Sequence, residues 1–251
     1  MTDLTHQLAS FIHSSNNILI FTGAGISTDS GISDYRSKGG LWQRFQPVTL
    51  QEFLSDENKR KEYWQHKLEL FFSLQTAQPN EGHRAIAALE QSGRLKGVIT
   101  QNIDGLHQMA GTPKHKLLEL HGTNREIVCL ECGDILPWEE IFLRLKNGEE
   151  APLCQKCNGL LKPNTISFGQ NLNSVTLEES FRWAAQCDLF LAVGSTLVVE
   201  PAASLPRVAK KNGAALVIIT LSETPLDNLA DLKIEAPLGA TLKHAVEHIE
   251  K

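Results

Sequence analysis

Polar side chains that could bind a ligand or move a proton follow two short apolar runs of the sequence. Gln101, Asn102 and Asp104 follow residues 98–100, and His121 stands between an apolar run and a glycine. A histidine, with an ordinary pKa near 6.5, can accept and return a proton at neutral pH. Structural explanations stay open, because Asn102 or Asp104 could cap a helix and a lone histidine is more often a satisfied surface side chain. The pattern indicates a candidate site with His121 as its base.

A glycine-rich stretch near the start of the chain is a candidate for cofactor binding. Gly23, Ala24 and Gly25 directly follow the apolar run 18–21, which predicts a buried parallel strand. Such glycines allow a tight turn and a close approach to a pyrophosphate, which the free N–H groups of a following short helix would face. The dinucleotide fingerprint is incomplete, since Thr28 replaces its third glycine and no acidic residue closes a second strand about 20 residues later. The motif alone leaves a dinucleotide site and a turn without a ligand equally open.

Two further polar segments accompany this stretch. Residues 31–36, Gly-Ile-Ser-Asp-Tyr-Arg, carry an acid and an arginine two positions apart. They are typical of a loop over a site rather than of the crossover helix of an ordinary dinucleotide fold. Gly194, Ser195 and Thr196 end another apolar run, and they could form an ordinary turn or a second set of donors for phosphate.

Four of the five cysteines form a metal-binding pattern. They occur as Cys129-x-x-Cys132 and Cys154-x-x-Cys157, with 21 residues between the pairs. Four thiolates placed about 2.3 Å from one ion would complete a tetrahedral zinc site with no open position, so the zinc would be structural. Two disulfides or four buried free thiols are the alternatives, and the lack of an export signal disfavours the disulfides. Cys187 is most simply a small buried hydrophobic residue.

The elements that must position these residues alternate between apolar strands and amphipathic helices. The polar motifs described above stand at the carboxyl ends of predicted strands. Because ligands bind at the carboxyl ends of strands in a parallel sheet, this coincidence is stronger than any single motif. We therefore expect an α/β fold with a doubly wound parallel sheet. The predicted strands cover residues 18–21, 98–100, 117–120, 188–193, 214–220 and 232–234.

Two stretches depart from this alternation. Residues 49–75, rich in charged and aromatic side chains, predict two helices outside the sheet, and residues 124–163 hold the cysteine pairs and a helix over 138–145. Thr176 and Glu179 fit a capping box at the start of a later helix. The other helices are expected near residues 4–12, from Asn80 to Gly93, over 103–110, from Pro201 to Gly213, and over 242–249.

The composition of the whole chain limits the possible classes of protein. The 251 residues, of which 41% are hydrophobic, suffice for one large domain or for one domain with a small insert. A net charge of −5 without a basic block argues against a nucleic-acid partner. The sequence shows no signal peptide and no apolar run of the roughly 18 residues that a spanning helix needs. We therefore expect no membrane association and a cytoplasmic location.

Considered together, the motifs resemble the sirtuins, a family of NAD-dependent protein-lysine deacylases. The resemblance covers nearly the whole chain, with every motif in family order. It implies a Rossmann-like NAD-binding domain of residues 1–37, 76–123 and 164–251. A small domain would combine a cofactor loop and helical insert, 38–75, with a zinc ribbon, 124–163. The motifs that carry the resemblance are residues 23–27, 31–36, 100–104, His121 with Gly122, the four paired cysteines, 168–169 and 194–202.

The resemblance also implies residue roles around one NAD molecule and one structural zinc ion. His121 would be the general base, and Asn102 would order the nicotinamide ribose and a nearby water as a second catalytic residue. Tyr35 would cover the nicotinamide pocket, and Arg36 would donate to the pyrophosphate. The other implied cofactor contacts are Gly23, Ala24, Gly25, Ser27, Asp34, Gln101, Ile103, Asp104, Gly194, Ser195, Thr196 and Thr220. The implied zinc ligands are Cys129, Cys132, Cys154 and Cys157.

The implied reaction is a group transfer that consumes NAD as a co-substrate. The acyl-lysine carbonyl oxygen attacks C1′ of the ribose as nicotinamide leaves, and the 2′-hydroxyl, deprotonated by His121, then attacks the acyl carbon. Water completes the release of free lysine and O-acyl-ADP-ribose. The acyl-lysine peptide would bind as an added strand between the two domains, in contact with Ile166, Phe168, Gly169, Val198 and Val199.

Some positions depart from the family pattern. Tyr35 replaces a phenylalanine but keeps the ring, Gln170 replaces a glutamate, and Thr220 replaces an asparagine that contacts adenosine. Members that prefer acidic acyl groups carry a Tyr-x-x-Arg pair, whereas His66 stands three residues after Tyr63 here, which implies a neutral acyl group, acetyl or longer. A protein ADP-ribosyltransferase that uses the same NAD site is the main alternative. An ordinary dehydrogenase and a non-enzymatic zinc-ribbon module fit the motifs less well.

Overall fold

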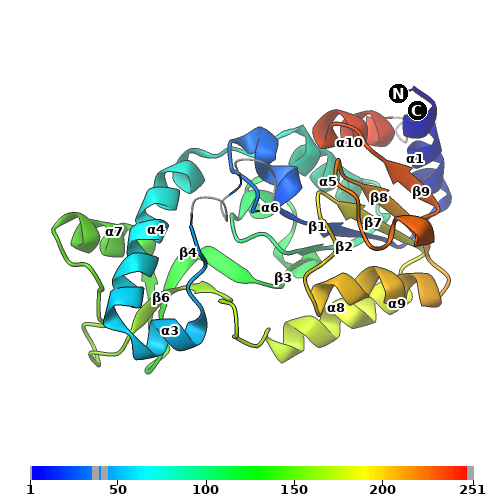
Figure 1. The fold of residues 1–251 in the computed structure, drawn as a ribbon. Helices are drawn as coiled ribbons and strands as arrows, with labels where there is room; N and C mark the ends of the chain where they lie inside the picture. Colours follow the sequence, from blue (N-terminus) through cyan, green and yellow to red (C-terminus); the bar gives the residue numbers. More distant parts are fainter. Residues whose placement is uncertain (1, 36–39, 41–44, 248–251) are drawn as a thin grey trace.

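A six-stranded parallel sheet forms the larger part of the protein (Figure 1). The computed structural model describes residues 2–35, 40 and 45–247. The strand order is β3-β2-β1-β7-β8-β9, and every neighbouring pair is parallel. The predicted α/β class and doubly wound sheet are therefore confirmed. The strands are β1 Ile18–Thr22, β2 Leu95–Thr100, β3 Leu117–Glu119, β7 Leu189–Val193, β8 Ala215–Ile219 and β9 Leu232–Ile234.

The chain reverses its direction of travel across the sheet next to β1. From β1 it passes to β2 and β3 on one side, and it later returns to β7, β8 and β9 on the other side. At such a switch point the turns that follow the two central strands diverge and leave room for a ligand. The glycine-rich turn after β1 and the turn after β7 are therefore neighbours at the carboxyl edge of the sheet.

Helices cover both faces of the parallel sheet. Strand β1 is buried along its whole length, with Ile18 and Ile20 in the core of one face and Leu19 and Phe21 in the core of the other. This two-sided burial explains why the strand is an unbroken apolar run. One face packs against α1 Thr2–Ser14, α5 Glu81–Gln91 and α10 Leu238–Glu247, and the other against α8 Ser174–Gln186 and α9 Leu205–Lys211 (Figure 1).

A second, smaller unit is built on a three-stranded antiparallel sheet of order β5-β4-β6. Its core joins Trp64 and Phe71 of one helix to Trp138 and Ile141 of another and to Ile127 of the sheet. The helical insert and the cysteine-bearing segment therefore share one core, as the resemblance implied. The elements are α3 Leu50–Ser55, α4 Glu57–Thr76, β4 Gly122–Cys129, β5 Ile135–Pro137, α7 Trp138–Lys146 and β6 Leu161–Thr165.

The exact domain boundaries stay a prediction. The boundary expected between residues 123 and 124 falls inside β4, and the one expected at 164 falls inside β6.

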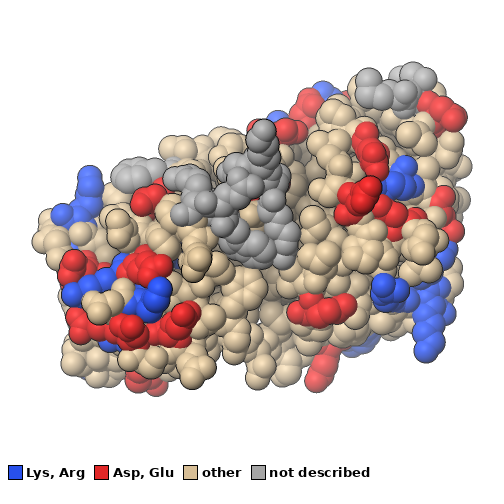
Figure 2. Space-filling model, viewed as in Figure 1, with Lys and Arg blue, Asp and Glu red and all other residues tan. Residues whose placement is uncertain are grey.

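On the face drawn in Figure 2, acidic and basic side chains lie intermixed over the end of the molecule that holds α3, α4 and α7. Some of these side chains form ion pairs. In one of them, Lys61 Nζ of α4 lies 2.9 Å from Glu150 Oε2, which follows α7.

The structure corrects the predicted starts of two helices. The N-cap of helix α8 is Asn173, three residues before the predicted cap Thr176, because the Asn173 side chain accepts a hydrogen bond from Thr176 N at 3.0 Å. The helix expected over 103–110 is only α6, Leu106–Met109. It starts late because Gly105 adopts a left-handed conformation with φ of 72° and the Asp104 side chain accepts from Leu106 N.

Several short turns of 3₁₀-helix replace regular helix. The turn after β1 is η1, Ala24–Ser30, where the sequence predicts a short helix. The helix expected from Pro201 is divided into η3, Ala202–Ser204, and α9. The others are η2 Lys114–Lys116 and η4 Asp227–Leu229.

Among the described residues, none of the helices has the length and apolar character needed to cross a membrane.

Candidate active site and metal centre

The turn after β1 packs directly on the turn after β7. Gly23 N donates to Val193 O at 3.0 Å, and Gly25 N donates to Gly194 O at 2.9 Å. An added Cβ would lie 2.7 Å from Gly194 O at Gly23 and 2.8 Å from Gly194 Cα at Gly25, closer than real side chains approach. The two glycines therefore have a packing role between the turns, in addition to the approach to a pyrophosphate inferred from the sequence.

Three buried polar side chains join the end of β2 to the glycine-rich turn. Ser27 Oγ donates to Asp104 Oδ2 at 2.7 Å, and Asn102 Nδ2 donates to Gly23 O at 3.1 Å and to Ser27 Oγ at 3.2 Å. Asp104 Oδ1 also accepts from Leu106 N, the first residue of α6, although the N-cap residue of this helix is Gly105. Asn102 does not cap the helix. The structure thus brings together residues that lie about 75 positions apart in the sequence.

Gln101 connects His121 to the turn after β7. His121 Nδ1 lies 2.9 Å from Gln101 O, and Gln101 Nε2 donates to Ser195 Oγ at 2.8 Å. Ser195 Oγ in turn accepts from Leu197 N at 3.2 Å. The polar residues at the ends of β1, β2, β3 and β7 therefore form one connected region at the carboxyl edge of the sheet. This is the edge at which the sequence predicts a ligand site.

The environment of His121 fixes its tautomer and lowers its pKa. A carbonyl oxygen can only accept a hydrogen bond, so His121 Nδ1 carries the proton that it donates to Gln101 O. The neutral ring then has its free lone pair on Nε2. Partial burial lowers the pKa of His121 below its ordinary value, and the hydrogen bond to Gln101 O partly opposes this shift. The ring is therefore mostly neutral at physiological pH, as a general base requires.

A polar layer beneath this site had no signal in the sequence motifs. Thr22 Oγ1 donates to Thr100 Oγ1 at 2.8 Å, and Asn102 N donates to the same Thr100 oxygen at 3.0 Å. His107 Nε2 lies 2.9 Å from Thr22 Oγ1, and burial lowers the pKa of His107 to about 3. These side chains hold the ends of β1 and β2 together. The sequence could have indicated this layer only through the threonines, Thr22 and Thr100, at the paired ends of β1 and β2.

The predicted cofactor loop is only partly described. Asp34 and Tyr35 follow the left-handed Gly31, and the Tyr35 side chain is 37% exposed. Arg36 lies outside the described residues. A cavity of about 220 Å³ borders Ile103 and Asp104 and extends toward Asn124 and Trp138. A larger cavity of about 530 Å³ lies at the start of α5, away from His121, and its lining mixes acidic and basic residues.

Two segments are predicted to hold a peptide: one lies next to His121 and the other follows the turn that carries Ser195. Ile166 N donates to His121 O at 2.9 Å, so the chain after β6 starts beside the histidine. Phe168 is 47% exposed and Gly169 is left-handed with φ of 80°. On the other side, Val198 is 49% exposed and Val199 is partly buried. Both segments present apolar side chains to solvent next to His121 and Ser195.

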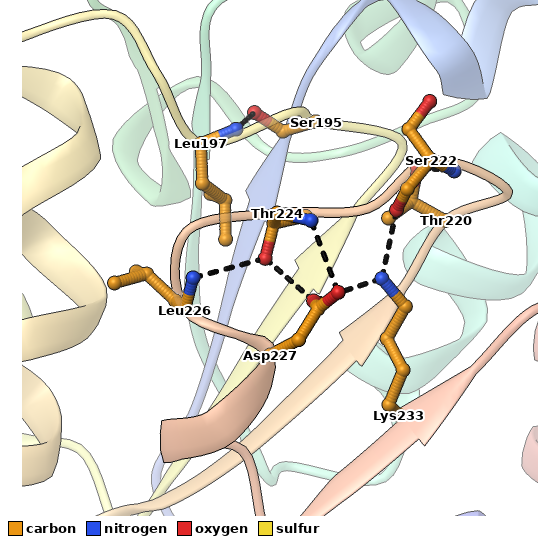
Figure 3. A network of polar contacts seen from close by, with 8 residues as sticks. All are labelled: Ser195, Leu197, Thr220, Ser222, Thr224, Leu226, Asp227 and Lys233. Carbon is orange, nitrogen blue, oxygen red and sulfur yellow. Dashed lines mark hydrogen bonds and ion pairs between the residues drawn. The ribbon is translucent and has the colours of Figure 1, made fainter.

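Thr220 lies at the end of β8 above a polar network that the sequence did not predict (Figure 3). Its Oγ1 accepts from Ser222 N at 3.4 Å, and Thr220 itself is buried. Asp227 accepts from Thr224 Oγ1 at 2.6 Å and from Lys233 Nζ at 2.9 Å, and Lys233 Nζ also donates to Ser222 O. These contacts fix the loop that follows β8 next to the turn carrying Ser195. Thr196 is partly buried in that turn.

The four paired cysteines form a compact tetrad at one end of β4. Their sulfur atoms all lie within 4.8 Å of one another, with Cys129–Cys157 at 3.5 Å and Cys132–Cys154 at 3.8 Å. A tetrahedral ion with bonds of about 2.3 Å requires sulfur separations of about 3.8 Å, whereas a disulfide requires about 2.05 Å. The cysteines are free thiols, so the disulfide alternative is excluded and the donor set fits one structural zinc ion.

The sequence of this chain is similar to the proteins of a known family. The Sir2 family model matches residues 23–201. An NAD-dependent protein deacetylase of Thermodesulfovibrio yellowstonii is 45% identical over 95% of this chain and 93% of its own length. NAD-dependent protein deacylase 2 of Archaeoglobus fulgidus is 40% identical over 100% of this chain and 98% of its own length.

Solved structures agree with these sequence relatives. A Sir2 structure with a p53 peptide and NAD+ aligns with a TM-score of 0.88 at 36% identity, covering 96% of this chain and 97% of its own. A Sir2 structure with a deacetylated p53 peptide and 3′-O-acetyl-ADP-ribose aligns with a TM-score of 0.91 at 35% identity, covering 97% and 98%. The parallel sheet, its polar edge and the cysteine tetrad thus define a Sir2-type fold. The chain belongs to the Sir2 family, the sirtuins.

Proposed function

We propose that this protein removes acyl groups, acetyl among them, from protein lysines and consumes one NAD per acyl group. The observation that carries the proposal is the connected polar edge of the sheet. It links the proposed base, His121, through Gln101 to Ser195, while Asn102, Ser27 and Asp104 form the adjoining network. The deacetylase and deacylase names of the relatives support the same activity.

The residues that would hold NAD lie in the turn after β1, in the turn after β7 and at the end of β2. Ala24 and Gly25, partly exposed at the start of η1, would face the pyrophosphate, together with Arg36. Gly194, Ser195 and Thr196 would contact the adenosine half, with Thr220 at its far side. Ser27, Asp34, Tyr35, Ile103 and Asp104 would enclose the nicotinamide. When bound, NAD supplies an ADP-ribosyl group with nicotinamide as its leaving group.

His121 and Asn102 have the two proposed catalytic roles. His121 would take a proton from a ribose hydroxyl through Nε2, because its Nδ1 proton is held by Gln101 O. Asn102 would orient the ribose and a water, since its Nδ2 is already fixed by Gly23 O and Ser27 Oγ. Fixed donors and acceptors of this kind lose little entropy when the reaction occurs.

The acyl-lysine peptide would lie as a strand between the segments 166–169 and 198–199. Phe168, Gly169 and Val198 are exposed, and the two segments flank His121 and Ser195, which would bring the acyl group to the proposed base. Main-chain pairing of this type tolerates many flanking sequences. Sir2 structures with a p53 peptide and with a propionylated peptide show that relatives bind such ligands. The cytoplasmic location stays an expectation from the sequence.

One experiment separates deacylation from ADP-ribosyl transfer. The protein is incubated with an acetyl-lysine peptide and with NAD carrying a label in the adenosine, and the products are separated by mass spectrometry. We expect free lysine peptide and labelled O-acetyl-ADP-ribose, and we expect His121→Ala to lower kcat/KM by at least about 10²-fold. Label retained on protein without deacylation would replace the proposal with the transferase alternative.

A further inference from the structure

The side chain of Asn80 joins the start of α5 to the turn that follows β1. Its Nδ2 donates to Ile26 O at 2.7 Å and to Ser30 Oγ at 3.0 Å, so it contacts both the interior and the last residue of η1. Its Oδ1 accepts from Gly82 N at 2.9 Å and from His83 N at 3.3 Å, which caps α5. One amide group therefore bridges two elements, although Asn80 and Ile26 lie 54 positions apart in the sequence.

The groups around Asn80 allow only one orientation of its amide. Ile26 O is a carbonyl oxygen that can only accept a hydrogen bond, and the N–H groups of Gly82 and His83 can only donate one. An exchange of Nδ2 and Oδ1 would therefore bring donors against donors and an acceptor against an acceptor. The fully buried His83 ring adds contacts, with its Nδ1 3.1 Å from Asn80 Oδ1 and 3.4 Å from Asn80 N. Both the backbone and the side chain of Asn80 are thus held in place.

Helix α5 approaches the turn closely because its second residue is a glycine. An added Cβ at Gly82 would lie 3.2 Å from Asn80 Oδ1 and 3.4 Å from Ile26 Cγ1, which is closer than most side chains pack. Glycine is a poor helix former, yet it occupies the first turn of this regular helix. Ile26 is 2% exposed. The close contact between α5 and η1 therefore depends on a residue without a side chain at this position.

A cavity of about 530 Å³ borders the end of the same turn. Asp29 and Ser30 of η1 line it together with Gln78 and Pro79, which precede Asn80. Atoms that line a cavity have no packing partners on that side. The hydrogen bonds from Asn80 thus hold an end of the turn that side-chain packing leaves unsupported on the side of the cavity.

The residues before Asn80 come directly from the small unit. Helix α4 ends at Thr76, and residues 77–79 connect it to Asn80 and α5 (Figure 1). Ala77 is 4% exposed, and its N–H donates to Ser73 O at 3.2 Å, so the connection begins at a fixed point of α4. Asn80 therefore stands where the chain that leaves the small unit meets the turn proposed to bind the pyrophosphate of NAD.

We propose that Asn80 is a positioning residue for NAD, whose side-chain amide holds η1 in the shape that binds the pyrophosphate. The inference rests on the proposed function, which places NAD at this turn. Asn80 acts through Ile26, whose neighbours Gly25 and Ser27 are both assigned to the NAD site. A displacement of Ile26 O would move both neighbours, and donors that are not held in place beforehand bind an anion less tightly.

Three substitutions separate the donor Nδ2 from the cap Oδ1. Asn80→Asp and Asn80→Ser keep an oxygen that caps a helix about as well as asparagine does, whereas Asn80→Ala removes it. Asn80→Asp has no N–H for Ile26 O, and the serine side chain is too short to reach it from the cap. If the proposal holds, affinity for NAD follows the donor and is lost in all three variants. Stability follows the cap, so Asn80→Ala should unfold at a lower temperature than the other two.

The affinity is measured with ADP-ribose, which carries the pyrophosphate but cannot react. Calorimetric titration should show a Kd raised by about 5-fold or more in Asn80→Asp and Asn80→Ser, the weight of one or two neutral hydrogen bonds. The KM for NAD should rise by a similar factor, while kcat at saturating NAD stays within about 2-fold. Asn173→Asp, which makes the same chemical change at the N-cap of α8, is the matched control and should change the Kd by less than about 2-fold.

Two results would overturn the inference. Affinity for ADP-ribose equal to that of the wild type in both Asn80→Asp and Asn80→Ser would leave Asn80 as a helix cap and no more. A fall in kcat with an unchanged KM for NAD would show that Asn80 does not act through NAD binding.

Failure of the proposed function would look different. A wild-type protein that does not bind ADP-ribose would refute the NAD site and the deacylase proposal with it. A wild-type protein that binds ADP-ribose, with no loss of affinity in the variants, would refute the role of Asn80 alone.

Discussion

The two sheets of this protein are held together in different ways. Strands β1 and β7 of the parallel sheet are buried along their whole length, and helices cover both faces of the sheet. The antiparallel sheet has two three-to-five-residue edge strands, β5 and β6, and a small aromatic core. Its central strand, β4, ends at Cys129, one of the four cysteines of the tetrad. The parallel sheet can thus rely on apolar burial, whereas we expect the small sheet to depend on a zinc ion bound by the tetrad as well.

This difference has a functional consequence, because the proposed site uses both units. The parallel sheet supplies the fixed polar edge with Asn102 and Gln101. Strand β4 begins directly after His121, and β6 leads into the segment proposed to bind the peptide. A small unit that loses its metal would therefore disturb the acyl side of the site while the NAD side keeps its support.

Loss of the metal should have the largest effect. Cys154→Ser removes one of four ligands, so we expect zinc to be lost and deacylation to fall by at least about 10²-fold, while the amides of β1 and β7 stay protected from hydrogen exchange. Elemental analysis, activity and exchange would measure this. Cys187→Ser, a buried cysteine outside the tetrad, should keep one zinc per chain. Full activity in zinc-free Cys154→Ser would show that the small sheet does not depend on a metal ion.

A core substitution should show the opposite behaviour. Leu191 is fully buried in β7, so Leu191→Ala should lower the free energy of unfolding by about 3 kcal/mol through lost burial and a new cavity. Zinc content should not change. Chemical denaturation measures the first quantity and elemental analysis the second. Leu143→Ala, at a side chain 60% exposed on α7, should cost less than about 0.5 kcal/mol. Zinc loss in Leu191→Ala would show that the two units are not independent.

A smaller effect is expected from the fixed amide at the polar edge. Asn102→Ala removes the donor to Gly23 O and Ser27 Oγ, so kcat should fall by about 10-fold or more while the KM for peptide stays within about 2-fold. Steady-state kinetics would measure the split. Asn212→Ala at the end of α9 is the control. An unchanged kcat would remove Asn102 from the catalytic residues.

The pH profile should report the lowered pKa of His121. The base is active in its neutral form, and burial lowers the pKa, so neutral His121 persists to lower pH than an exposed histidine. We expect kcat/KM to fall on the acid side, with the midpoint of that limb below 6.5, the ordinary pKa of histidine. An acid limb with its midpoint above 6.5 would contradict the role of burial.

The smallest effect concerns the adenosine side. Thr220 contacts Ser222 N with a short side chain, and the Asp227–Lys233 network fixes the loop beyond it (Figure 3). Thr220→Asn lengthens the polar side chain, so we expect the KM for NAD to fall by about 2-fold to 3-fold with kcat unchanged. A higher KM would show that the threonine is fitted to this loop.

The sequence predicted most of what depends on local pattern. Unbroken apolar runs located the strands of the parallel sheet, and the spacing of the cysteines predicted their tetrad. Local signals misled where two competed: Thr176 fits a capping box, but Asn173 caps the helix three residues earlier. The left-handed Gly105 delays the start of the helix expected from Ile103 until Leu106.

Contacts between distant segments could not be read from the sequence. The packing of Gly23 and Gly25 on Gly194 depends on the strand order, which local patterns do not fix. The proximity of Lys67 to Lys162 likewise depends on how α4 packs against β6, which no local pattern of the sequence indicates. Motif spacing identifies the candidate residues, and only the fold shows which of them share one environment.

The stoichiometry of the products tests the central claim most directly, that the polar edge of the sheet supports cleavage of NAD coupled to deacylation. A single incubation with NAD and an acetyl-lysine peptide, analysed by mass spectrometry, should yield nicotinamide, O-acetyl-ADP-ribose and free lysine peptide in equal amounts. The His121→Ala variant should lose the last two products. In the wild type, free lysine peptide formed without nicotinamide, or nicotinamide formed without free lysine peptide, would contradict the account.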